Sequence, residues 1–122
     1  MPTINEVMER VDALRPNALE EQDKARWLLE LDGRNYREVT AADSPEALPP
    51  QSWPEDGDKP LLVQAPYDSM YSLYLTAMVE FAQGEYGDYN NTCALFDQAQ
   101  QEWRAQYRRE HLPKRRDYQN VM

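Results

Sequence analysis

Acidic side chains supply most of the groups in this chain that could do chemistry, with 22 Asp and Glu residues among 122. General acid or base catalysis needs a carboxyl group whose pKa is shifted by an apolar pocket or a like charge. No carboxylate pair in the sequence is flanked by an apolar stretch of that kind, so we expect the acids to be solvated at the surface. The loop Asp56-Gly57-Asp58 lacks the register and the closing glutamate of an EF-hand, so it does not indicate a calcium site.

The remaining chemical groups form no catalytic or metal-binding pattern either. His111, the single histidine, falls among basic residues at the end of an expected helix, where a cation complements the helix dipole. Cys93 lies on an expected apolar stripe with no histidine near it in sequence, so we interpret it as core filler rather than a nucleophile. The glycines have no phosphate-cradling spacing. The sequence therefore predicts no catalytic, cofactor-binding or metal-binding residue, and a protein that is not an enzyme.

Charge is distributed unevenly along the chain, whose formal net charge is −9. Residues 61–100 contain five acids and no base, whereas residues 101–122 contain three acids and six bases. The negative total argues against a general nucleic-acid binder and against a protein held on anionic lipid. An acidic stretch followed by a basic end makes the chain bipolar, which favours head-to-tail or ring association.

Apolar runs in the sequence are too short for a transmembrane span, and the N-terminus does not open with a basic and then apolar stretch. We therefore expect no membrane association and a location in the cytoplasm. The length suits one domain over 1–122 with a single hydrophobic core.

Two helices are predicted in the first third of the chain. The first begins at Thr3, which can form a capping box with Glu6, and ends at Pro16. Its apolar face is formed by Ile4, Val7, Met8, Val11 and Leu14. Asn17 with Glu20 repeats the capping pattern for the second helix. Its apolar face is formed by Leu28, Leu31 and Val39, with Trp27 beside it.

The composition changes after the second helix, whose last part is weakened by Gly33 and Asn35. Residues 40–60 contain five of the nine prolines and five acids, which is typical of a loop or arm. Trp53 within this arm costs solubility unless it docks on another surface. Residues 61–63 are a short apolar run that could be an edge strand or the anchor of the arm on the core. We expect the arm to be mobile in an isolated monomer and ordered by a neighbour.

Two long helices are predicted in the second half. The third begins at Pro66, has Asp68 in its first turn and ends at Gly84. Its stripe consists of Tyr67, Met70, Tyr71, Tyr74, Leu75, Met78, Phe81 and Ala82. The fourth begins near Asp88 and ends at Pro113, before a basic tail at 114–122. Its stripe consists of Tyr89, Cys93, Phe96, Trp103 and Tyr107, with Gln100 as one polar member. The pattern predicts an all-α, four-helix domain whose last two helices form an antiparallel hairpin.

Aromatic and basic side chains are the candidates for an interaction surface. The Tyr-rich third helix is either an amphipathic core face or a core face that also serves a partner, since tyrosine buries its ring while its hydroxyl still bonds. The basic cluster near the C-terminus could bind nucleic acid, but an acidic protein or a neighbouring subunit suits it at least as well. The candidate interface residues are Trp53, Tyr67, Tyr71, Tyr74, Arg104, Arg108, Arg109, Lys114, Arg115 and Arg116.

Four segments carry a resemblance to a known family: LLVQAPYD at 61–68, EFAQGEYGDYNN at 80–91, LDGRNYRE at 31–38 and HLPK at 111–114. In these motifs the chain resembles the head–tail connector, or adaptor, proteins of tailed phages and prophages. The resemblance implies a helical structural protein without enzymatic activity or cofactor. It also implies a ring of copies between the portal protein and a tail or stopper protein, through which DNA passes without specific binding. The implied location is the virion, and the host bacterial cytoplasm during assembly.

The charge pattern fits the same function, because an acidic wall around a DNA passage repels phosphate and lets the duplex slide. A different class of function stays open: a small acidic regulator or DNA mimic that binds a nucleic-acid enzyme through residues 61–100. An unrecognised enzyme comes third, since no set of nucleophile, base and orienting group can be assembled from the chain.

Overall fold

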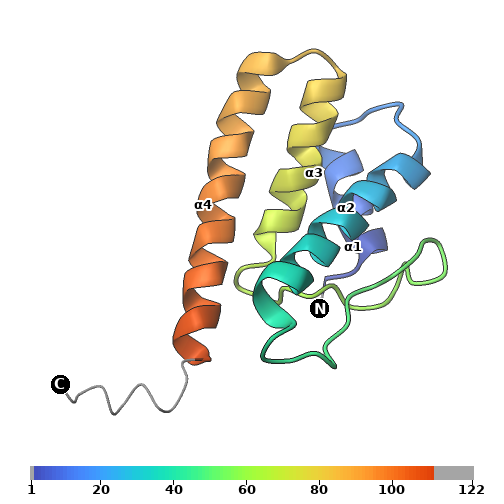
Figure 1. Ribbon diagram of the computed structural model, residues 1–122. Coiled ribbons are helices and arrows are strands. Elements are labelled where there is room, and N and C mark those ends of the chain that lie inside the picture. The colour runs from blue at the N-terminus through green and yellow to red at the C-terminus, as the bar shows by residue number, and fades with distance from the viewer. Residues whose placement is uncertain (1, 112–122) are drawn as a thin grey trace, which may run out of the picture.

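The computed structural model describes residues 2–111, which form four α-helices and one π-helical turn (Figure 1). The elements are α1 (Ile4–Leu14), α2 (Glu21–Asn35), the turn η1 (Tyr36–Thr40), α3 (Ser69–Ala82) and α4 (Tyr86–Glu110). α3 and α4 pack side by side as an antiparallel hairpin, and α1 and α2 contact α3 and each other. The predicted all-α fold with its C-terminal hairpin is confirmed. None of the helices in residues 2–111 is long and apolar enough to cross a membrane.

The hydrophobic core lies where α1, α2 and α3 meet. Its largest fully buried apolar side chains are Ile4, Val7, Val11, Leu28, Leu31, Leu61, Val63, Met70, Tyr71, Leu75 and Val79. Leu61 and Val63 come from the segment between the arm and α3, so this segment is an anchor on the core rather than an edge strand. α4 contributes only Trp103 to the buried hydrophobic cluster. The outer helix of the hairpin is therefore mostly exposed.

The first two helices begin in different ways. Thr3 caps α1 as predicted, since its Oγ1 accepts a hydrogen bond from the backbone N–H of Glu6 at 3.1 Å. The predicted start of α2 at Asn17 is wrong, because α2 begins at Glu21. The Asn17 side chain stabilises the connection instead, accepting from the Leu19 N–H at 3.1 Å and donating to Asp12 at 3.0 Å.

The hairpin helices start and stop close to the predicted positions. The start of α3 at Pro66 is wrong by three residues, because residues 64–68 form a turn in which the Tyr67 N–H donates to the Gln64 carbonyl at 3.0 Å. α3 ends just before Gly84, whose φ of +78° is a conformation that glycine adopts without strain. α4 begins at Tyr86, two residues before the predicted start, and ends at Glu110. The predicted stop at Pro113 and the tail at 114–122 lie outside the described residues.

The proline-rich arm lies against α1 of its own chain. The Trp53 indole N–H donates to Asn5 Oδ1 at 2.9 Å, and the Asn5 backbone N–H donates to the Gly57 carbonyl at 3.1 Å. Trp53 is half-buried at this contact. A side chain at Gly57 would place its Cβ 2.6 Å from Asn5 Nδ2, so the close approach of the arm to α1 favours glycine there. The indole thus docks within the chain, while the mobility of the arm stays a prediction.

Candidate interaction site

Burial divides the predicted aromatic interface residues into two groups. Tyr71 is fully buried, so its assignment to an interface is wrong. Its ring lies in the core because its hydroxyl finds a partner there, donating to Asp32 Oδ1 at 2.6 Å. Tyr67 and Tyr74 are half-buried, and the Tyr74 ring packs on Phe96 of α4 with 5.1 Å between the centroids. Both tyrosines pack against the hydrophobic core, and part of each side chain stays accessible.

The predicted basic interface residues also differ in their surroundings. Arg104 is half-buried and donates to Glu38 at 2.9 Å and to Asn35 at 3.1 Å, so it ties α4 to the end of α2. Arg108 and Arg109 are exposed in the last turn of α4. His111 follows, with its ring stacked on Tyr107 at 3.8 Å and Nδ1 2.9 Å from the Tyr107 carbonyl. The predicted interface residues Lys114, Arg115 and Arg116 lie outside the described residues.

A buried polar network joins α2, α3 and the anchor segment. Asp32 is fully buried and accepts hydrogen bonds from the Tyr71 hydroxyl at 2.6 Å and from the Leu62 backbone N–H at 2.8 Å. The Val63 N–H in turn donates to the Tyr71 oxygen at 2.7 Å. Burial raises the pKa of Asp32 to about 6, although the two hydrogen bonds act in the opposite direction. The expectation that the acids are solvated is therefore wrong for Asp32.

Acidic side chains also gather at the tip of the hairpin, around Arg15 from the end of α1. The Arg15 guanidinium pairs with Glu80, with Glu85 at 3.0 Å and with Asp88 at 3.7 Å. Glu80 is buried, so it is a second exception to the expected solvated acids. Three of the five acids in residues 61–100 thus surround one cation that is distant in sequence. The tip remains net negative, but less so than the charge of that segment indicates.

Aromatic rings stand beside these acids at the same tip. Phe81 at the end of α3 packs on Tyr86 and Tyr89 at the start of α4, with centroid distances of 5.6 and 5.2 Å. Phe81 is 52% exposed and Tyr86 58% exposed. The periodicity of the sequence predicts that Phe81 and Tyr89 lie on core-facing stripes, and it assigns no role to Tyr86. The apolar stripes of α3 and α4 continue beyond the end of the hydrophobic core. Their periodicity therefore does not distinguish these exposed rings from buried ones.

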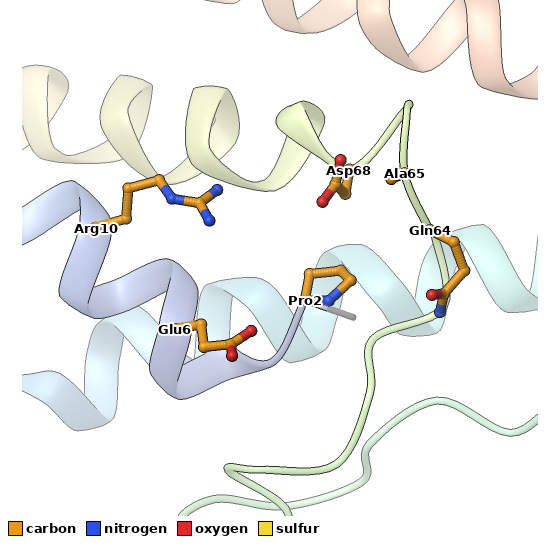
Figure 2. A pocket seen from close by; sticks show the side chains of 6 residues that line it. All are labelled: Pro2, Glu6, Arg10, Gln64, Ala65 and Asp68. Carbon is orange, nitrogen blue, oxygen red and sulfur yellow. The ribbon is translucent and has the colours of Figure 1, made fainter.

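A polar hollow of about 330 Å³ lies between α1 and the turn before α3 (Figure 2). It is lined by Pro2, Glu6, Arg10, Gln64, Ala65 and Asp68. Sites for small molecules are mostly lined by apolar and aromatic side chains, with a few polar groups that orient the ligand. Four of the six residues that line this hollow are polar or charged, so it lacks the mainly apolar lining of such sites and we do not regard it as the functional site.

A scan against protein-family models, a search of curated proteins and a search of solved structures each found no match. The resemblance to head–tail connectors therefore rests on the sequence motifs. Two of these segments contact each other in the structure, since Asp32 in 31–38 accepts a hydrogen bond from the Leu62 backbone N–H in 61–68. Residues 80–91 form the tip of the hairpin.

Proposed function

We propose that this chain is a non-enzymatic structural subunit that assembles into a ring, as a head–tail connector of a tailed phage or prophage. One observation carries the proposal: the long helix α4 is packed along α3 and leaves most of its surface open. α4 spans 25 residues, yet only Thr92 and Trp103 in it are buried. A helix of this length is about 37 Å long. Such a surface suits lateral contact with neighbouring copies.

The hairpin also offers chemically different ends to its neighbours. The tip carries exposed aromatic rings and a net negative charge, whereas the last turn of α4 carries Arg108 and Arg109. Different patches that face each other in successive copies give a head-to-tail arrangement, which closes into a ring when the rotation between copies allows it. In this proposal the ring lies between the portal protein and a tail or stopper protein of the virion, and DNA passes without specific binding.

A regulator that mimics DNA is supported less well. Mimicry needs carboxylates spaced along a surface like phosphates on a duplex. The acids of residues 61–100 are few, and three of them share Arg15. No observation favours this second function over a structural subunit.

Reconstitution with a portal protein tests the proposed function. The full chain is mixed with the portal protein encoded in the same genome, and the mixture is imaged by negative-stain electron microscopy. We expect a ring of this chain stacked on the portal ring, with a continuous central channel. Portal rings that remain bare at a large excess of this chain would contradict the connector function.

A further inference from the structure

The hairpin tip carries a surface that the fold itself does not explain. We define the tip surface as Phe81, Glu85, Tyr86, Asp88 and Tyr89. Phe81 and Tyr86 are more than half exposed, and Phe81 packs on the two tyrosine rings rather than on the hydrophobic core. Large apolar groups exposed beside charged ones are characteristic of protein interaction sites. The tip surface is therefore a candidate contact for a partner.

The charge of the tip surface indicates which kind of side chain a partner would present to it. Glu85 and Asp88 are exposed, and together with buried Glu80 they share the single positive charge of Arg15. Carboxylates that stand beside aromatic faces form the environment that a guanidinium prefers. It stacks on the ring and donates paired hydrogen bonds to the carboxylate. The tip surface thus suits an exposed arginine better than a lysine, an anion or a neutral chain.

Exposed arginines of this kind occur at the other end of the same helix. Arg108 and Arg109 lie in the last turn of α4, whereas Tyr86 and Asp88 lie in its first turn. The two groups are separated by most of a helix that is about 37 Å long, so they cannot meet within one chain. They can meet between two copies.

We propose that the tip surface of one copy binds Arg108 and Arg109 of a second copy of this chain. The inference rests on the proposed self-assembly and names the contact that makes it. The contact leaves one tip and one arginine pair unsatisfied in every open assembly, so a closed ring satisfies all of them. Because the contact pairs exposed charges, it is weakened by salt.

Charge exchange between full-length variants tests the contact. Asp88→Lys alters the tip and Arg108→Glu/Arg109→Glu alters the other end, while Tyr86→Ser removes a ring. Asp97→Lys is the matched control for Asp88→Lys. Leu95→Ser is the control for Tyr86→Ser, since Leu95 is 55% exposed on the same helix. Association is measured by sedimentation velocity over a concentration series at low and high salt, and circular dichroism checks the helix content.

Wild type and both controls are expected to associate alike, whereas each interface variant weakens association at least tenfold. An equimolar mixture of Asp88→Lys with Arg108→Glu/Arg109→Glu is expected to associate more tightly than either variant alone. Both contacts between unlike copies pair opposite charges, since the altered tip meets the altered helix end and the unaltered tip meets the unaltered arginines. Association of wild type that the interface variants leave unchanged, or a mixture without recovery, would overturn this contact and leave ring assembly standing. A wild type that stays monomeric at all concentrations would overturn both proposals.

Discussion

Replacing Asp32 by asparagine is expected to remove a large pH dependence from the stability of the fold. Asp32 is buried without a cation among its hydrogen-bond partners, which are the Tyr71 hydroxyl and the Leu62 N–H. Its pKa is about 6 in the folded chain, against the ordinary value of 3.8. The folded chain therefore holds this proton more tightly than the unfolded chain does. Between about pH 4 and pH 6, the contribution of Asp32 to the free energy of unfolding falls as pH rises.

The size of this effect follows from the difference between the two pKa values. One pKa unit corresponds to about 1.4 kcal/mol, so the contribution of Asp32 drops by roughly 3 kcal/mol between acidic and neutral pH. Asparagine keeps the shape of the protonated acid but does not titrate. The free energy of unfolding of wild type minus that of Asp32→Asn is therefore expected to fall by about 2 kcal/mol from pH 4 to pH 7, since the unfolded acid is already partly ionised at pH 4.

Urea denaturation followed by circular dichroism at pH 4, 5, 6 and 7 measures this difference. Taking the difference cancels the titration of the other carboxylates, which both proteins share. Asp97→Asn, which removes an exposed carboxylate, is the matched control. A wild-type-minus-Asp32→Asn difference that rises with pH, or that follows the same course as the Asp97→Asn difference, would refute the reasoning. It would mean that the two hydrogen bonds outweigh the cost of burying the charge.

Three further substitutions test the contacts that hold the fold together. Gly57→Ala is expected to displace Asn5 and break its bond to the indole, lowering stability by about 1 kcal/mol in thermal denaturation and changing the tryptophan fluorescence. Arg104→Ala leaves the buried amide of Asn35 without this donor, and is expected to lower the free energy of unfolding in urea by about 1–3 kcal/mol. Arg15→Ala removes the cation from the three tip acids and is expected to lower the melting temperature measured by circular dichroism.

Matched controls separate the effect of each contact from the general effect of the same type of substitution. Gly87→Ala is the control for Gly57→Ala, since a Cβ at Gly87 meets no atom within 4 Å. Arg34→Ala and Arg26→Ala, at exposed arginines of α2, are the controls for Arg104→Ala and Arg15→Ala, respectively. Equal effects within any pair would contradict the assigned contact.

Periodicity and local capping were enough to predict the helices, because these signals lie within a few residues of each other. The tyrosine-rich stripe that ends at Gly84 predicted α3, and the Thr3 cap predicted the start of α1. The starts of α2 and α3 were wrong because Asn17 and residues 64–68 use their hydrogen bonds in turns. Turns and helix caps draw on the same residue types, so the sequence alone does not separate them.

The polar side chains inside the fold could not be predicted in the same way. The buried Asp32 accepts its hydrogen bonds from residues at positions 62 and 71. Arg15 pairs with Glu80 and Glu85, which also lie far along the chain. Tyr71 was a candidate interface residue because tyrosine buries its ring while its hydroxyl still bonds, and here the hydroxyl bonds to Asp32 inside the core. Such pairings depend on tertiary packing, which brings together residues that local patterns cannot connect.

Assembly of the purified full chain is the most direct test of the proposed connector. Native mass spectrometry over a range of micromolar concentrations measures the mass of the species in solution. The proposal predicts one closed oligomer, with a mass that is a fixed multiple of the subunit mass and does not change with concentration. A monomer at every concentration, or a ladder of species that grows without limit, would contradict a ring-forming subunit.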